Sequence, residues 1–294
     1  MRPILPGRVY LVTRRCSQRQ FLLRPDEKTN QAFLYCLGEA AQRFGIELVG
    51  WLAMSNHYHA VVHDPLGRLP DFACHFHQML AKCLNVRWSR WENLWSTEPP
   101  TYTLLVDPAD VLDKLLYTLL NPVVDRLVDS VAHWPGASSW SLLDGNALVV
   151  RRPKFFFRDA GVMPETITLK TIVAPGFDDT REAWAARLRE TVLARELELR
   201  GRLRAAGGRI LGRKAVRAAS AFDRPSTSEP RRNLRPFIAC KNRRRRVGAL
   251  DALRRFRAAY REARCRLVDG LRCVLFPAGT FGLRRLGVLV AAPR

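Results

Sequence analysis

The stretch IELVGWLAMSNHYHAVV, residues 46–62, decides the predicted fold. Two runs of β-branched and aromatic side chains, residues 46–54 and 57–62, flank the turn dipeptide Ser55-Asn56. Two strands joined by a turn this short pair antiparallel, because a parallel connection needs a long crossover. The stretch therefore predicts a β-hairpin.

The second strand of this hairpin carries His57 and His59. Side chains at i and i+2 of a strand share a face, so both imidazoles point the same way, and together they form half of a metal site. The alternative is a pair of partly buried strand histidines, which is the more frequent meaning of an isolated H-x-H. His75 and His77 repeat the pattern in a predicted helix, where they point about 200° apart and cannot bind one ion.

The segments around the hairpin complete a β-α-β-β-α-β-α order. Gly45 closes the first predicted helix, and Asn121-Pro122 ends the last one. The order predicts an α+β fold with a central antiparallel sheet flanked by helices. The other predicted strands are residues 7–13 and 102–106, and the predicted helices are residues 25–44, 75–90 and 108–120.

Composition indicates a folded protein with a polyanionic partner. The chain has 294 residues, of which 47% are hydrophobic, so disorder throughout is excluded. Its 49 Lys and Arg face 27 Asp and Glu, a net charge of +22. Nucleic acid is the first expected partner and an anionic membrane surface the second. Residues 1–150 hold 14 basic and 14 acidic side chains, whereas residues 151–294 hold 35 and 13, so we predict two domains with this boundary.

The second half is an arginine-rich extension with predicted helices at residues 180–206 and 250–267. A solvated polybasic tail is the alternative, but the extension has too many large apolar side chains for a purely disordered arm. At its centre lie Lys241, Arg243, Arg244, Arg245 and Arg246.

The seven cysteines are scattered and never form a C-x-x-C pair. This argues against a disulfide framework and a zinc ribbon. No segment has the pattern of a signal peptide or a transmembrane helix. We therefore expect a cytoplasmic protein that is not bound to a membrane.

A second candidate for chemistry is Tyr117 with Asn121. The two residues are i and i+4 on a predicted helix, so the phenol and the amide share a face, and Lys114 at i−3 joins them. Taken alone, a helix-boundary tyrosine is more often a packing residue, and Asn before Pro is an ordinary helix end.

Together the two candidates resemble a known family. MSNHYHAVV (54–62) followed by LLYTLLNPV (115–123) resembles the HUH single-tyrosine transposases, and most closely the REP-associated tyrosine transposases. The resemblance covers residues 5–143, and residues 274–288 resemble an extension found in a long-chain subgroup. Leu11 and Val124-Asp125 depart from the family pattern. Further matches are PGRVYLVTRR (6–15), WENLWS (91–96) and NPVVDRLVDSVAHWPGASSW (121–140).

The resemblance implies a ferredoxin-like (RRM-like) HUH domain that binds one Mg²⁺ or Mn²⁺ through His57, His59 and Asn121. Tyr117 would attack single-stranded DNA beside a hairpin, leaving a 5′-phosphotyrosine and a free 3′-OH. Tyr102 is the second candidate nucleophile. Lys114 and His63 are candidate supporting residues.

The expected partner is single-stranded or hairpin DNA with palindromic repeats, handled in a bacterial cytoplasm near the nucleoid by a monomer or homodimer. Arg14 and Arg15, together with the five basic residues at 241–246, are the expected DNA contacts. The alternatives are a non-catalytic DNA- or RNA-binding protein on a former transposase scaffold, and a metal-dependent hydrolase that uses activated water.

Overall fold

The computed structural model describes residues 1–157, 163–227 and 236–293. The strands are β1 (Arg8–Arg15), β2 (Glu47–Ala53), β3 (His57–Asp64), β4 (Thr101–Leu105), β5 (Leu148–Arg151), β6 (Thr166–Leu169), β7 (Ile238–Ala239), β8 (Leu275–Phe276) and β9 (Leu289–Val290). The α-helices are α1 (Glu27–Phe44), α2 (Leu69–Arg87), α3 (Pro108–Val124), α4 (Arg181–Ala205), α5 (Arg213–Ala218) and α6 (Arg243–Val268). Short 3₁₀ turns are Ser17–Arg19, Val131–His133, Trp140–Leu142 and Gly282–Leu286.

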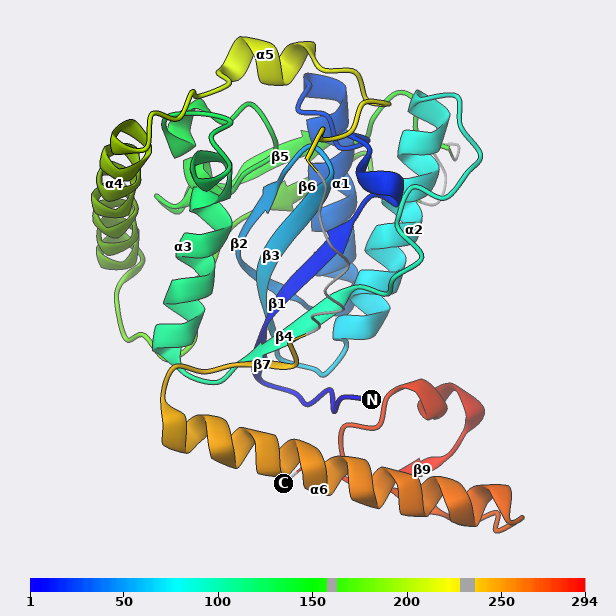
Figure 1. Cartoon of the computed structure of the whole chain (residues 1–294). Coiled ribbons are helices and arrows are strands. Elements are labelled where there is room, and N and C mark those ends of the chain that lie inside the picture. Colours follow the sequence, from blue (N-terminus) through cyan, green and yellow to red (C-terminus); the bar gives the residue numbers. More distant parts are fainter. Residues whose placement is uncertain (158–162, 228–235, 294) are drawn as a thin grey trace.

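A five-stranded sheet in the order β2-β3-β1-β4-β7 forms the centre of the molecule (Figure 1). The pairs among the first four strands are antiparallel, and the predicted β2–β3 hairpin is confirmed. β7 pairs parallel with β4, so the sheet is mixed and the expected wholly antiparallel sheet is wrong in this strand. The reason is long-range: β7 comes from the C-terminal half and satisfies the open edge of β4.

Helices cover both faces of this sheet. Alternate residues of β3 separate the two cores: Tyr58, Ala60 and Val62 pack with α1 and α2, whereas Val61 packs with α3. Helix α3 in turn packs against α4, whose Trp184 lies in the same core. The face of the sheet that carries the even-numbered β3 residues is therefore covered by α1 and α2. The face that carries the odd-numbered residues is covered by α3.

Two predicted helix boundaries in the first half need correction. Helix α2 begins at Leu69, not at residue 75, because both oxygens of the Asp64 carboxylate accept the Arg68 and Leu69 amides at 2.8 Å and satisfy its first turn. Helix α3 continues to Val124 instead of ending at Asn121-Pro122. Proline removes only one amide donor, and Val123 is fully buried in the core, which holds the last turn in place.

Helix α6 begins at Arg243 instead of residue 250, so the arginine run lies inside a helix. The Asn242 side chain caps it by accepting the Arg245 amide at 3.1 Å. Sequence patterning missed this start because the first turn carries no apolar residue until Val247. The α1 and α4 predictions are confirmed, and Gly45 ends α1 with φ 65° as expected.

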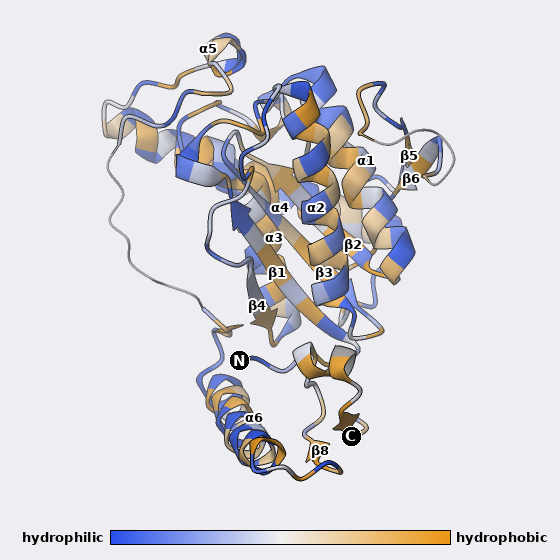
Figure 2. Cartoon of the chain, turned by 90° about the vertical axis from the view of Figure 1, so that its right-hand side faces the viewer, coloured by the Kyte–Doolittle hydropathy of each residue, from blue (hydrophilic) through white to orange (hydrophobic). Residues whose placement is uncertain are grey.

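The second half of the chain surrounds the first. β5 pairs with β6 and runs across residue 150, so the two-domain division stays a prediction. Figure 2 shows α6, β8 and the C-terminus below the sheet and α5 above it. No described helix carries an apolar stretch long enough to cross a membrane.

Candidate active site

His57 and His59 lie at the start of β3. Their ring centroids are 4.8 Å apart and the rings are nearly perpendicular, at 86°. Tyr58 between them points to the other face, where its ring contacts Phe33 and Phe76 of α1 and α2. The strand thus brings the two imidazoles together on the side of the sheet that α3 covers.

The His59 imidazole is buried and unsatisfied. It is 6% exposed, and among the described residues neither Nδ1 nor Nε2 has a hydrogen-bond partner. Burial first, and the neighbouring His57 second, hold its pKa well below the ordinary value, so the ring is neutral. Unpartnered buried nitrogens are costly, and the neutral imidazole is the form that binds a metal ion. This ring therefore fits the divalent cation that the sequence implies.

Tyr117 stands beside this ring. Its ring centroid is 5.2 Å from that of His59, and the residue is 48% exposed, so the side chain is accessible from solvent. The Lys114 ammonium lies 5.7 Å from the Tyr117 ring centroid and pairs with Asp113 at 3.0 Å. Helical spacing therefore places a cation near the phenol, as the sequence predicts.

Asn121 follows Tyr117 by one helical turn and is buried, 6% exposed. It is absent from the residues that line the cleft described below, whereas Asp125, one turn further along α3, does line it. Sequence reasoning noted Asp125 only as a departure from a family pattern. The i, i+4, i+8 spacing of Tyr117, Asn121 and Asp125 is the signal that would have identified it as a site residue.

A cavity of about 920 Å³ opens in front of the histidines and Tyr117. The end of β1 contributes Arg14 and Arg15, which are the two DNA contacts predicted in the first half of the chain. The other charged residues of its wall are Arg19, Glu98, Asp125 and Arg224. With four arginines facing two carboxylates, the cleft favours an anionic ligand.

One wall of the cleft comes from the C-terminal half. Residues 209–227, which include α5, cross the cleft and are called the strap below. Near its start, the amides of Leu211 and Gly212 donate to the carbonyls of Arg126 and Leu127 at 2.9 and 3.0 Å, just beyond α3. One end of the strap is thereby fixed beside the helix that carries Tyr117.

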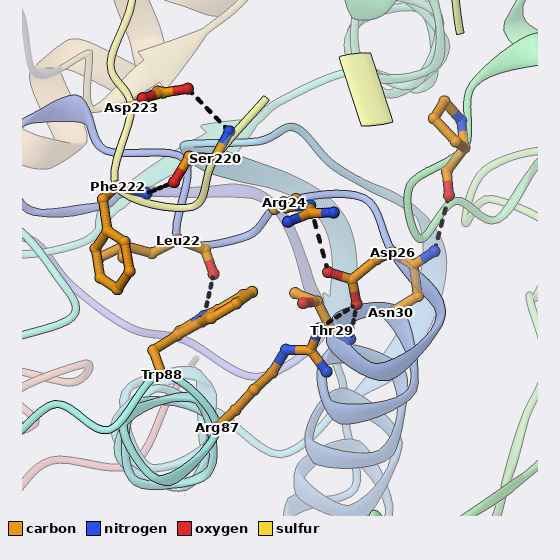
Figure 3. Close-up of polar contacts among 11 residues, drawn as sticks. Leu22, Arg24, Asp26, Thr29, Asn30, Arg87, Trp88, Ser220, Phe222 and Asp223 are labelled. Carbon is orange, nitrogen blue, oxygen red and sulfur yellow. Dashed lines mark hydrogen bonds and ion pairs between the residues drawn. The ribbon is translucent and has the colours of Figure 1, made fainter. Parts of the chain in front are cut away.

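The far end of the strap is fixed to the turn that follows β1. The Phe21 amide donates to the Asp223 carbonyl at 2.9 Å. The ring centroids of Phe222 and Trp88 are 6.3 Å apart. Figure 3 shows Phe222 beside Leu22 and Trp88, with Ser220 and Asp223 closing the local turn. Between these two attachments the strap contributes Val216 and Ala219 to the cleft wall, and beyond Asp223 it contributes residues 224–227.

The other tyrosines of the first half, which include the second candidate Tyr102, do not line this cleft. Tyr102 packs with the α1 and α2 core, and burial raises its pKa. Burial also raises the pKa of Tyr58 well above its ordinary value, and that of Tyr10 and Tyr35 to about 12. Tyr117 is the tyrosine that lines the cleft within the described residues.

Several predicted site residues lie elsewhere. His63 is at the opposite end of β3, where its Nδ1 lies 2.7 Å from a Glu47 carboxylate oxygen. The basic run 241–246 lies beside the N-terminus of α3, and none of its residues lines the cleft. Lys241 pairs with Asp113 and Arg245 with Asp107.

Asp107, Asp110 and Cys240 form the group of potential metal ligands found among the described residues. Internal hydrogen bonds occupy it. Asp110 accepts the amides of Asp107 and Lys241 at 3.1 and 2.8 Å, and the Cys240 thiol lies 3.4 Å from Asp107. This group of three residues, called the clamp below, therefore joins the beginnings of α3 and α6.

No protein-family model matches the chain, and no curated protein does. Among solved structures, a REP-associated tyrosine transposase bound to a REP hairpin is similar, with a TM-score of 0.38 and 18% identity. The alignment covers 48% of this chain and 81% of that one.

Proposed function

We propose that the chain is a metal-dependent single-stranded DNA endonuclease and strand transferase, a transposase that cuts beside DNA hairpins through a 5′-phosphotyrosine intermediate. The central sheet would belong to a ferredoxin-like HUH domain, and the antiparallel order β4-β1-β3-β2 supports this assignment. The observation that carries the proposal is the contact between the accessible Tyr117 and the buried, neutral His59.

The metal-binding residues would be His57, His59 and Asn121. Their two imidazoles and one amide oxygen leave coordination positions open for water and phosphate, which suits Mg²⁺ or Mn²⁺. The bound ion would supply charge neutralisation at the scissile phosphate. The Asn56 side-chain oxygen Oδ1, 2.7 Å from His57 Nδ1, would orient that ring so that its other nitrogen serves as ligand.

Tyr117 would be the nucleophile. The phenol loses its proton to solvent, its oxygen forms a bond to phosphorus, and the bond from phosphorus to the 3′ oxygen breaks, so that a 3′-OH leaves with a proton from water. Lys114 would favour the phenolate electrostatically. The phosphotyrosine ester conserves the energy of the broken bond, so rejoining needs no nucleotide cofactor.

The cleft would hold the strand through Arg15 and Arg224, which line it from β1 and from the strap, and Arg14 lines it as well. Arg14 has a buried Nε without a hydrogen-bond partner among the described residues and lies over the Trp95 ring at 5.3 Å. Burial lowers its pKa, yet a guanidinium remains charged at neutral pH. Because Arg14 pairs with Tyr58, its side chain lies on the opposite face of the sheet from the two histidines, whereas Arg15 pairs with His57 and shares their face.

The test is incubation of the full chain with a single-stranded oligonucleotide that contains a hairpin, in Mn²⁺ and in EDTA, followed by denaturing electrophoresis. We expect a protein–DNA adduct that needs the metal ion and is lost in Tyr117→Phe. Tyr102→Phe, the matched control, should keep it. Cleavage without an adduct would indicate a hydrolase that uses activated water, and binding without cleavage a non-catalytic nucleic-acid-binding protein.

A further inference from the structure

One face of helix α6 is buried against another segment of the chain. Leu253, Phe256, Tyr260 and Ala263 are its buried residues, and they pack on the segment around Phe276. The rest of the helix surface faces solvent and is strongly basic, with ten arginines against two acidic residues. Figure 2 shows this mostly hydrophilic helix standing apart from the sheet.

The arginines are not spread evenly around the exposed surface. At 100° per residue, six of them fall on one flank without any acidic residue, and this set is called the arginine stripe. The opposite flank mixes the two signs. The arginine stripe consists of Arg243, Arg246, Arg254, Arg257, Arg261 and Arg264. The mixed flank consists of Arg244, Asp251, Arg255, Glu262 and Arg266.

Most of the stripe lacks a hydrogen-bond or ion-pair partner among the described residues. Arg254 bonds Asp251 at 2.8 Å, and Arg257 donates to the Met1 carbonyl at 3.1 Å. The remaining four stripe arginines make no side-chain hydrogen bond or ion pair with any described residue. Apart from the interval of eight between Arg246 and Arg254, neighbouring stripe residues are three or four positions apart, a spacing at which like charges destabilise a helix. Such a row is explained by a polyanion that neutralises it.

The geometry of the stripe favours duplex DNA. Residues 243–264 extend about 32 Å along a straight helix, so the guanidinium groups form a long row suited to contact with phosphates. Single-strand sites add exposed aromatic rings for base stacking, and here Phe256 and Tyr260 are buried. A membrane-surface helix needs a free apolar face, and that of α6 is covered.

The stripe also lies far from the cleft. Helix α6 begins beside Asp107, at the end of the sheet where Val9 pairs with Leu105, whereas His57 pairs with Arg15 at the other end of β1. Six strand residues separate the two ends, about 20 Å. Figure 1 shows α6 below the sheet and the strap above it.

We propose that the arginine stripe of α6 binds the backbone of duplex DNA at a second site, separate from the cleft. The proposal goes beyond strand cleavage, because duplex binding at the stripe needs neither Tyr117 nor a metal ion. It changes the role expected for the basic run: these arginines contact a different segment of DNA from the one held at His57 and His59.

The test compares two triple variants of the full chain that remove equal charge from the same helix. R243Q/R261Q/R264Q empties the stripe, and R244Q/R255Q/R266Q, the control, changes the mixed flank. Fluorescence anisotropy with a hairpin-free duplex of about 30 base pairs gives the affinity between about 50 and 200 mM salt. We expect the log–log salt slope to fall by about 2.7 in the stripe variant, from three lost phosphate contacts, and by less than about 1 in the control.

An equal fall in both variants, or no fall in the stripe variant, would overturn the proposal. The proposal would also be overturned if the stripe variant lost as much affinity for a single strand of the same length as for the duplex. Binding of the stripe to phosphatidylserine vesicles, without binding to the duplex, would overturn it too. Adduct formation on a short hairpin substrate reports the proposed function separately: Tyr117→Phe should lose the adduct and keep duplex binding, and R243Q/R261Q/R264Q should do the reverse. Circular dichroism checks that both triple variants remain folded.

Discussion

The buried His77 side chain should lower the free energy of unfolding in acid. Its side chain is 2% exposed, Nε2 lies 2.7 Å from the Tyr58 hydroxyl, and Nδ1 has no hydrogen-bond partner among the described residues. Burial, and to a smaller extent the charge of Arg14, holds its pKa well below the ordinary 6.5. The unfolded chain takes up a proton at this histidine as the pH falls through 6.5, and the folded chain does not.

The sign follows from proton uptake by the unfolded state, which stabilises that state at low pH and lowers the free energy of unfolding. For a histidine that titrates at 6.5 when unfolded and stays neutral when folded, the loss between about pH 7.5 and 5.5 is about 1.4 kcal/mol. In His77→Gln this contribution is absent. Other groups contribute to the pH dependence of both proteins alike, so the difference between wild type and variant isolates His77.

Urea unfolding of wild type and His77→Gln at the two pH values measures this double difference. Leu80→Met, at a fully buried position on the same helix, is the control, because it should change the free energy of unfolding equally at both pH values. A double difference below about 0.5 kcal/mol would show that folded His77 takes up a proton over this range, which contradicts the burial argument.

Three further predictions use the packing and the cleft. Gly50→Ala should lower the free energy of unfolding by about 1–3 kcal/mol in urea, because a Cβ there would lie 2.4 Å from Leu115 of α3; an unchanged midpoint would contradict this packing. Arg224→Gln should reduce the salt slope for a single strand by about 0.7, the loss of one phosphate contact, and an unaltered slope would remove the strap from the binding site. Ellman's reagent should modify three thiols quickly and four only on unfolding, and a fourth fast thiol in the folded protein would contradict the burial. The fast thiols are Cys74, Cys265 and Cys273.

Local patterns predicted the elements around the site well. The alternation in β3 placed His57 and His59 on one face, and the four-residue spacing placed Tyr117 and Asn121 on one side of α3. These predictions succeed because the period of a strand or helix is fixed by backbone geometry, whatever the rest of the chain does. Helix ends were less predictable, since Asp64 starts α2 from outside the helix.

Local patterns could not predict the contacts between segments that are distant in sequence. β7 is two residues long and has no strand pattern of its own, and it forms because β4 offers unpaired backbone groups. The strap has no periodicity either, and its position follows from hydrogen bonds to Arg126, Leu127 and Phe21, residues that lie far from it in the chain. Clamp residues such as Asp107 likewise look like ordinary cap residues until Arg245 is seen beside them.

The sequence by itself determined that the two histidines share one face of a strand, that Tyr117 and Asn121 share one face of a helix, and that the basic excess lies in the second half. Only the tertiary structure decided that this excess is divided, with Arg224 in the strap at the cleft and the arginine stripe at the opposite end of the sheet. The physical reason is that charge and periodicity are local properties of a chain. Which surfaces meet depends on apolar faces buried at long range, here α4 against α3 and α6 against the segment around Phe276.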